Sequence, residues 1–144
     1  MKEKYITVSE AETKNIAADF AAKLVPGSVV ALEGDLGAGK TVFVKGVANA
    51  LGYHGDVTSP TFTLINIYQT QINTDIYHMD FYRLNNVQEI LDIGTEEYLY
   101  GDNICLVEWA CKMGDEFPAD AYRINIKLLG KEKREIIIEK KERF

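Results

Sequence analysis

Apolar residues recur at helical spacing in three parts of the chain. Between residues 10 and 24 they recur every four positions, which predicts a helix, and Ser9 and Glu12 have the spacing of a capping box at its start. Similar patterns predict a second helix over residues 40–51 and a short one over residues 86–93.

Runs rich in β-branched and aromatic residues predict the strands. Val29–Glu33 and Ile104–Val107 are continuous apolar runs, typical of strands buried on both faces of a sheet that helices cover. The order of helices and strands predicts an α/β fold, a mixed parallel and antiparallel sheet flanked by helices. The other expected strands span residues 5–8, 61–68, 72–80, 123–129 and 135–139, and the last four form two hairpins.

The length of the chain favours one domain. Its 144 residues contain no internal repeat, low-complexity tract or linker, so we expect a single domain over residues 1–144. The longest apolar runs are far shorter than the roughly 20 residues that a membrane span needs. No apolar segment of a secretion signal follows the N-terminus, so we expect a cytoplasmic protein without a membrane partner.

Charge, cysteine content and histidine content argue against nucleic-acid binding, a redox pair and a zinc site. A net charge of −6 argues against autonomous binding of nucleic acid. Cys105 and Cys111 match neither a C-x-x-C redox pair nor a zinc knuckle, so we expect both to be reduced and structural. His54 and His78 are too few and too scattered to build a metal site by themselves.

The segment Gly34–Thr41 carries the clearest chemical signal. Its sequence GDLGAGKT matches G-x-x-x-x-G-K-[ST] at every position, between a predicted strand and a predicted helix. Glycines let backbone N–H groups converge on phosphate oxygens, and the alternative is a glycine-rich turn that matches by chance. Lys40 is expected to reach the β- and γ-phosphates, and Thr41 to place its hydroxyl on Mg²⁺. The expected nucleotide contacts here are Asp35, Leu36, Gly37, Ala38, Gly39, Lys40, Thr41 and Val42.

A phosphate-binding loop needs an acid for its metal ion, and two acids end apolar strands. Glu108 closes the strand 104–107 in the manner of a Walker B acid, and Asp80 closes the strand before it. The alternative for each is a solvated carboxylate at a strand end. With Lys40, these two acids are the candidate catalytic residues.

Two further features lie near these positions in the chain. Thr58–Thr63 is a hydroxyl-rich turn where P-loop proteins place switch segments, and a Thr here could sense the γ-phosphate through Mg²⁺. A plain Ser-Pro turn is an equally good interpretation. Trp109, the single tryptophan, is either a core residue or an aromatic wall beside the nucleotide.

These motifs together resemble one protein family. The loop at Gly34–Thr41, the sequence SPTF at 59–62, HMDFYRL at 78–84 and EW at 108–109 follow in the order of the TsaE (YjeE) family, small bacterial ATPases of tRNA threonylcarbamoyladenosine (t6A) biosynthesis. The similarity extends over about residues 7–129. The H-x-D-x-Y-R-L and E-W elements are much more specific than the loop.

The resemblance implies a P-loop α/β fold that binds ATP and Mg²⁺ and hydrolyses ATP slowly alone. It also implies association with the TsaD–TsaB heterodimer, which transfers the threonylcarbamoyl group to adenosine 37 of tRNAs. Contact with tRNA would then be indirect, through that complex, and the role of the ATPase would be to support turnover of the transferase.

The resemblance also implies roles for single residues. Lys40 and Thr41 match the phosphate and Mg²⁺ ligands, and Glu108 matches the acid that completes the metal site. Asp80 matches an acid needed for hydrolysis, and Trp109 matches a tryptophan beside the nucleotide. Val42 departs from the family, where a second Thr often follows the loop. We transfer nothing to the tail beyond residue 130.

Other functions of a phosphate-binding loop remain as alternatives. A small P-loop metabolite kinase would close an arginine-bearing lid over the phosphates, and no segment resembles one. A GTPase would need an N-K-x-D stretch, which the sequence lacks. A non-enzymatic, nucleotide-gated interaction module differs only in whether hydrolysis matters. The arginines of the chain are Arg83, Arg123, Arg134 and Arg143.

Overall fold

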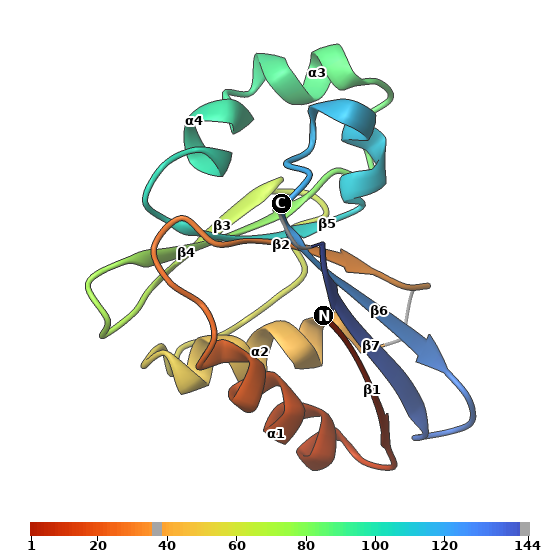
Figure 1. Cartoon of the computed structure of the whole chain (residues 1–144). Coiled ribbons are helices and arrows are strands. Elements are labelled where there is room, and N and C mark those ends of the chain that lie inside the picture. Colours follow the sequence, from red (N-terminus) through yellow and green to blue (C-terminus); the bar gives the residue numbers. More distant parts are fainter. Residues whose placement is uncertain (36–38, 142–144) are drawn as a thin grey trace.

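A seven-stranded mixed sheet runs through the centre of the computed structural model, which describes residues 1–35 and 39–141 (Figure 1). Three of the expected nucleotide contacts, Leu36, Gly37 and Ala38, lie outside the described residues. The elements are β1 (Lys2–Thr7), α1 (Glu10–Ala21), β2 (Val29–Glu33), α2 (Lys40–Ala50), β3 (Ile65–Gln69), β4 (Asp75–Asp80), α3 (Val87–Asp92), α4 (Thr95–Leu99), β5 (Ile104–Glu108), the 3-10 helix η1 (Ala110–Glu116), β6 (Tyr122–Leu128) and β7 (Arg134–Lys140).

The strand order across the sheet is β1-β7-β6-β2-β5-β4-β3. The four central strands β6, β2, β5 and β4 are parallel to one another. The outer pairs β3/β4, β6/β7 and β1/β7 are antiparallel. The expected α/β class with a mixed sheet is therefore confirmed, and so are both predicted hairpins.

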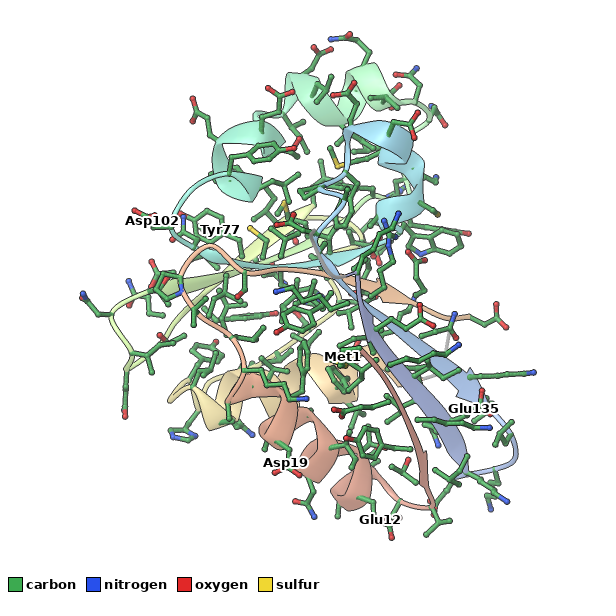
Figure 2. The ribbon with its side chains drawn as sticks, in the orientation of Figure 1. Met1, Glu12, Asp19, Tyr77, Asp102 and Glu135 are labelled. Atoms are coloured by element: carbon green, nitrogen blue, oxygen red, sulfur yellow. The ribbon has the colours of Figure 1, made fainter. Side chains whose placement is uncertain are left out.

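Helices cover the two faces of the sheet separately. The helices α1 and α2 lie on one face, and α3, α4 and η1 lie on the other (Figure 1). Side chains fill the space on both sides of the sheet (Figure 2). Two apolar clusters result, one built on Phe20, Phe43 and Leu32, the other on Met79, Phe81 and Val107.

The first helix begins as the capping-box pattern predicts. The Ser9 hydroxyl accepts a hydrogen bond from the Glu12 backbone N–H at 3.2 Å, and the Glu12 carboxylate accepts one from the Val8 N–H at 2.9 Å. The helix ends at Ala21 rather than at residue 24, because residues 22 and 23 already form a turn.

Three predicted strand starts are wrong. The strand β1 begins at Lys2 rather than at residue 5, and β4 begins at Asp75 rather than at residue 72. The strand expected over 61–68 begins only at Ile65, because residues 61–63 form a turn and Leu64 has a φ of 69°. The Leu64 N–H donates to the Pro60 carbonyl at 2.7 Å and closes this turn. The hydroxyl-rich segment therefore lies outside the sheet ladder, beside the end of β4.

Within the described ranges, no helix has the length and apolar character needed to cross a bilayer.

Candidate functional site

The candidate site lies where the parallel strands β2, β4 and β5 end. In the register of the sheet, Glu108 pairs with Leu32 on one side and with Asp80 on the other. Parallel strands end at the same edge of a sheet, and ligands of open α/β sheets bind outside this edge. The two predicted acids are therefore neighbours on adjacent strands.

Lys40 is brought to the same edge by α2, of which it is the first residue. Its side chain is buried, and its Nζ lies 3.7 Å from Glu108 Oε1. Gly39, directly before it, has a φ of 105° in the left-handed region, and an added Cβ would approach Arg134 Nε to 3.0 Å. A glycine at this position thus allows the turn that starts the helix beside the strand ends.

Both acids are buried: Glu108 is 4% exposed and Asp80 is 3% exposed. The alternative of solvated carboxylates at strand ends is therefore wrong for both. The two oxygens of Glu108 have different neighbours, because Oε1 faces Lys40 and Oε2 accepts a hydrogen bond from His78 Nε2 at 2.6 Å.

Asp80 is held by donors that do not contact Glu108. Its Oδ2 accepts a hydrogen bond from the Thr61 hydroxyl at 2.9 Å, and its Oδ1 accepts one from the Tyr82 backbone N–H at 2.8 Å. Thr61 belongs to the predicted switch segment, and the Ser59 hydroxyl lies 2.8 Å from the Thr61 hydroxyl. The segment thus contacts one of the two site acids directly.

Trp109 directly follows the strand that ends in Glu108. Its φ of 59° lies in the left-handed region, which is strained for an aromatic residue and turns the chain sharply into η1. The indole is half-buried, and Lys40 Nζ lies 5.3 Å from the ring centroid. The Tyr82 ring packs against it at 5.0 Å between centroids. Trp109 is thus a wall of the site as well as a contact of the core.

A hollow of about 380 Å³ opens beside Lys40 and Trp109. Asp35, the start of the predicted phosphate loop, lines it and is exposed. Glu33, at the end of β2, also lines it, and burial raises the pKa of this carboxyl while Arg123 and Lys40 lower it in part. The hollow has the size of a small ligand site.

The side-chain oxygen atoms at this edge of the sheet are of the kind that binds Mg²⁺. Mg²⁺ is held by one or two carboxylates together with phosphate oxygens and water, rather than by a cage of protein ligands. A Mg²⁺ ion here would take a carboxylate oxygen from Glu108, at the end of β5, and a hydroxyl oxygen from Thr41, in the first turn of α2. Over residues 1–35 and 39–141, no group of three or more His, Cys, Asp or Glu side chains forms such a cage.

Thr41 and Val42 both lie half-buried in the first turn of α2, next to Lys40. Of the predicted site residues, the structure brings Lys40, Asp80, Glu108 and Trp109 together at this edge of the sheet.

Three site neighbours were not predicted as such. His78 contacts Glu108, Tyr68 contacts His78, and Lys112 Nζ lies 5.9 Å from the Trp109 ring centroid. A signal existed for His78, because a residue two positions before Asp80 on a strand shares its face. No local signal marks Tyr68 or Lys112, whose contacts depend on the packing of distant segments.

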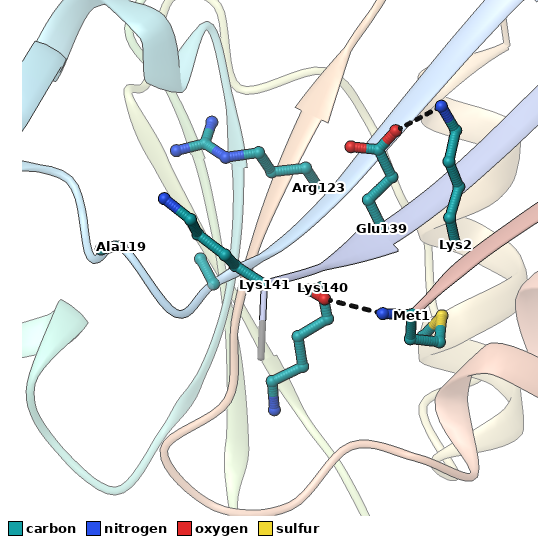
Figure 3. A pocket seen from close by; sticks show the side chains of 8 residues that line it. Met1, Lys2, Ala119, Arg123, Glu139, Lys140 and Lys141 are labelled. Carbon is teal, nitrogen blue, oxygen red and sulfur yellow. Dashed lines mark hydrogen bonds and ion pairs between the residues drawn. The ribbon is translucent and has the colours of Figure 1, made fainter. Parts of the chain in front are cut away.

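A second hollow lies away from these residues, near the chain termini (Figure 3). It measures about 500 Å³, and its walls include Lys2, Arg123 and Lys141. Lys2 pairs with Glu139 at 3.2 Å, and the Met1 amine donates to the Lys140 carbonyl at 3.1 Å (Figure 3). None of the predicted site residues lines it.

Known proteins are similar to this chain over the part that contains the candidate site. The family model described as "Threonylcarbamoyl adenosine biosynthesis protein TsaE" matches residues 7–136. The tRNA threonylcarbamoyladenosine biosynthesis protein TsaE of Bacillus subtilis (strain 168) is 47% identical over 133 residues, which cover 92% of this chain and 82% of the relative. The protein of the same description from Treponema pallidum (strain Nichols) is 44% identical over 115 residues, covering 80% and 84%.

A solved structure is similar as well. The crystal structure of Bacillus subtilis YdiB superposes with a TM-score of 0.78 at 42% sequence identity, and the match covers 96% of this chain and 84% of that one. The family match includes every candidate site residue from Asp35 to Trp109. The resemblance seen in the motifs is confirmed, and the chain belongs to the TsaE family of threonylcarbamoyl adenosine biosynthesis proteins.

Proposed function

We propose that this chain binds ATP with Mg²⁺ at the carboxyl edge of the sheet and hydrolyses the ATP. We further propose that it does so in tRNA t6A biosynthesis, acting on the TsaD–TsaB transferase to support its turnover. The observation that carries the ATPase is the convergence of Lys40, Glu108 and Asp80 at one edge. Family membership and the names of the relatives support the pathway.

Lys40 and the start of α2 bind the phosphates in this proposal. An ammonium group that is only 6% exposed acts on a phosphate through little intervening water, which strengthens its interaction. To reach a phosphate, Lys40 exchanges its 3.7 Å contact with Glu108 for phosphate oxygens. Glu108 and Thr41 hold the Mg²⁺ ion, which when bound neutralises charge on the phosphates.

Asp80 orients the water molecule that attacks the γ-phosphate. The two donors on Asp80, from Thr61 and Tyr82, fix the carboxylate in one rotation. Each carboxylate oxygen has lone pairs left after one hydrogen bond, so Asp80 can still accept a proton of the water. Positioning of this kind is the main protein contribution to phosphoryl transfer.

Release of phosphate from ATP without any added acceptor tests the proposal, since a kinase would need its second substrate. We expect Glu108→Gln and Asp80→Asn each to lower this rate by on the order of 100-fold. Glu108→Gln should also weaken the Mg²⁺ dependence of nucleotide binding, whereas Asp80→Asn should leave binding nearly intact. If only Asp80→Asn weakened the Mg²⁺ dependence, the two roles would be exchanged.

Lys40→Ala tests the phosphate contact itself. We expect this variant to lose ATP binding and to remain folded, because His78 still compensates the buried Glu108. The loss of the buried Lys40 contact should cost about 1–3 kcal/mol in the free energy of unfolding. ATP affinity by calorimetry and thermal unfolding measure the two effects. Unchanged ATP affinity in the folded variant would remove the phosphate-loop assignment.

A further inference from the structure

Behind Glu108, inside the apolar cluster between the sheet and α2, lies a buried polar pair. His78 is 0% exposed and Tyr68 is 3% exposed. The Tyr68 hydroxyl lies 3.0 Å from His78 Nδ1, and the other ring nitrogen of His78 lies 2.6 Å from Glu108 Oε2. An imidazole and a phenol buried in a core cost free energy unless hydrogen bonds compensate them.

The chemistry of the donors gives this chain of contacts a direction. A carboxylate can only accept, so His78 Nε2 carries the hydrogen that bonds Glu108 Oε2. In the neutral ring this leaves Nδ1 as an acceptor, 3.0 Å from the Tyr68 hydroxyl and closer to it than the Thr58 carbonyl at 3.4 Å. Burial raises the pKa of Tyr68, so the hydroxyl keeps its proton for donation. Tyr68 thus fixes the ring tautomer and His78 in turn fixes the carboxylate.

The two oxygens of Glu108 consequently differ in role. Oε2 is engaged by His78, and Oε1 points to Lys40 at 3.7 Å. Without the imidazole, Oε2 would lose the hydrogen bond that distinguishes it from Oε1. A metal ligand that must present one oxygen in one direction depends on such a partner behind it.

We propose that His78 and Tyr68 are positioning residues that hold Glu108 Oε2 from behind and thereby present Oε1 as a single ligand toward the phosphate and Mg²⁺ site. The inference rests on the proposed function, and neither residue touches the nucleotide. Asp80 is outside this arrangement, because its donors are Thr61 and Tyr82. The pair therefore acts on Mg²⁺ binding through Glu108, and within the described part of the chain neither side chain hydrogen-bonds to Asp80.

The test follows Mg²⁺ affinity rather than activity alone. Trp109 is the single tryptophan, and it lies beside Lys40, so its fluorescence reports nucleotide binding. A non-hydrolysable ATP analogue is titrated without metal, and Mg²⁺ is then titrated into the complex. We expect His78→Phe, which keeps a ring but loses the donor, to weaken Mg²⁺ affinity by about 10- to 100-fold. Affinity for the analogue without metal should stay within about twofold.

Two milder variants keep the test decisive if His78→Phe does not fold. Tyr68→Phe removes only the hydroxyl, and we expect it to weaken Mg²⁺ affinity by about 3- to 10-fold. His78→Gln carries an amide N–H near the position of Nε2, so it should recover most of the affinity that His78→Phe loses. Tyr122→Phe is the matched control, because it removes a hydroxyl from the same apolar cluster without any contact to Glu108 among the described residues.

The outcomes separate this inference from the proposed function. If the unaltered protein does not bind the analogue with Mg²⁺, the proposed function fails and the inference fails with it. If it binds, and Tyr68→Phe and the folded His78 variants keep its Mg²⁺ affinity, only the positioning role is overturned. An equal loss of affinity with and without metal, or an equal effect of Tyr122→Phe, would also overturn it, because both indicate general damage to the core.

Discussion

The partners of each buried acid determine what a single substitution does. Glu108 is compensated by Lys40 and His78, whereas Asp80 is compensated by Thr61 and the Tyr82 backbone. Because these sets share no member, each substitution removes a different set of contacts. The distinct effects expected for Glu108→Gln and Asp80→Asn follow from this separation.

The two cysteines differ in burial, and this predicts different reactivity. Burial raises the pKa of Cys105 to about 12, and its thiol donates to the Tyr98 carbonyl, whereas Cys111 is exposed. Only the thiolate reacts with disulfide reagents. At pH 8 we expect one thiol to react in the folded protein and two in urea, and Cys111→Ser to abolish the reaction of the folded form. Two fast thiols in the folded protein would contradict this.

The same pKa shift affects stability at alkaline pH. An unfolded cysteine has a pKa of about 8.5, so folding raises the pKa of Cys105. The protonated thiol therefore contributes fully below pH 8.5, and this contribution decreases as the pH rises toward about 12. Urea unfolding at pH 8 and pH 10, compared with a Cys105→Ala variant, measures it. The loss of stability between the two values should be smaller in the variant.

At the scale of single residues, local motifs identified the candidate site residues but not their contacts. Lys40 and Glu108 could be found because a phosphate loop and a strand-end acid are local patterns. Their burial could not be predicted, since it depends on which strands are neighbours. His78 shares a face with Asp80, but its bond to Glu108 crosses from β4 to β5.

Among the elements, α1 and α2 pack closely, and Gly46 is where they meet. A Cβ added to Gly46 would lie 2.7 Å from Ala17 Cβ and 3.0 Å from the Lys14 carbonyl oxygen. We expect Gly46→Ala to lower the free energy of unfolding by about 1–2 kcal/mol, because the overlap outweighs the gain in helix propensity. Chemical denaturation measures this loss.

A second glycine and a second substitution control for this prediction. At Gly130, in the β6–β7 turn, an added Cβ would meet only Lys133 Cβ at 3.8 Å, so Gly130→Ala should be nearly neutral. Ala17→Gly should restore part of the stability that Gly46→Ala loses, since it removes the shortest contact. Equal effects at Gly46 and Gly130 would show that packing against α1 is not the cause.

The helices α1, α2 and the short α3 were predicted, whereas α4 and η1 were not. The start of α1 follows from Ser9 and Glu12, whose hydrogen bonds are local. The helix α4 and the 3-10 helix η1 span only five and seven residues, too few for a helical period to show. The β3 boundary was wrong because Thr61 bonds Asp80 instead of entering the ladder.

For the whole molecule, the class of fold was predictable and the order of strands was not. The buried runs of β2 and β5 predicted a helix-covered sheet, and the hairpins follow from short turns. The placement of β6 beside β2 joins residues about 90 positions apart in the chain, which no local pattern encodes. Because β6 lies there, its residues line the hollow beside Lys40 and Trp109.

The segment 58–63 connects the site to the surface of the molecule. Thr61 donates to Asp80, while the next residue, Phe62, is 81% exposed, with Arg83 stacked 4.5 Å from its ring centroid. A nucleotide that changes the surroundings of Asp80 therefore acts on a segment that a partner can touch. Under the proposed function, nucleotide state and partner binding would be linked through this segment.

Under the proposed function, this linkage predicts that ATP strengthens binding to the TsaD–TsaB pair. We expect a non-hydrolysable ATP analogue to tighten that binding by about 5- to 150-fold relative to ADP or no nucleotide. By reciprocity, the pair must tighten the analogue by the same factor. Thr61→Ala should reduce the factor, because it cuts the bond to Asp80. Thr63→Ala, whose hydroxyl bonds Asn66 instead, should not. Equal partner affinity in all three nucleotide states would rule out the switch, even if Lys40 and Glu108 bind nucleotide as proposed.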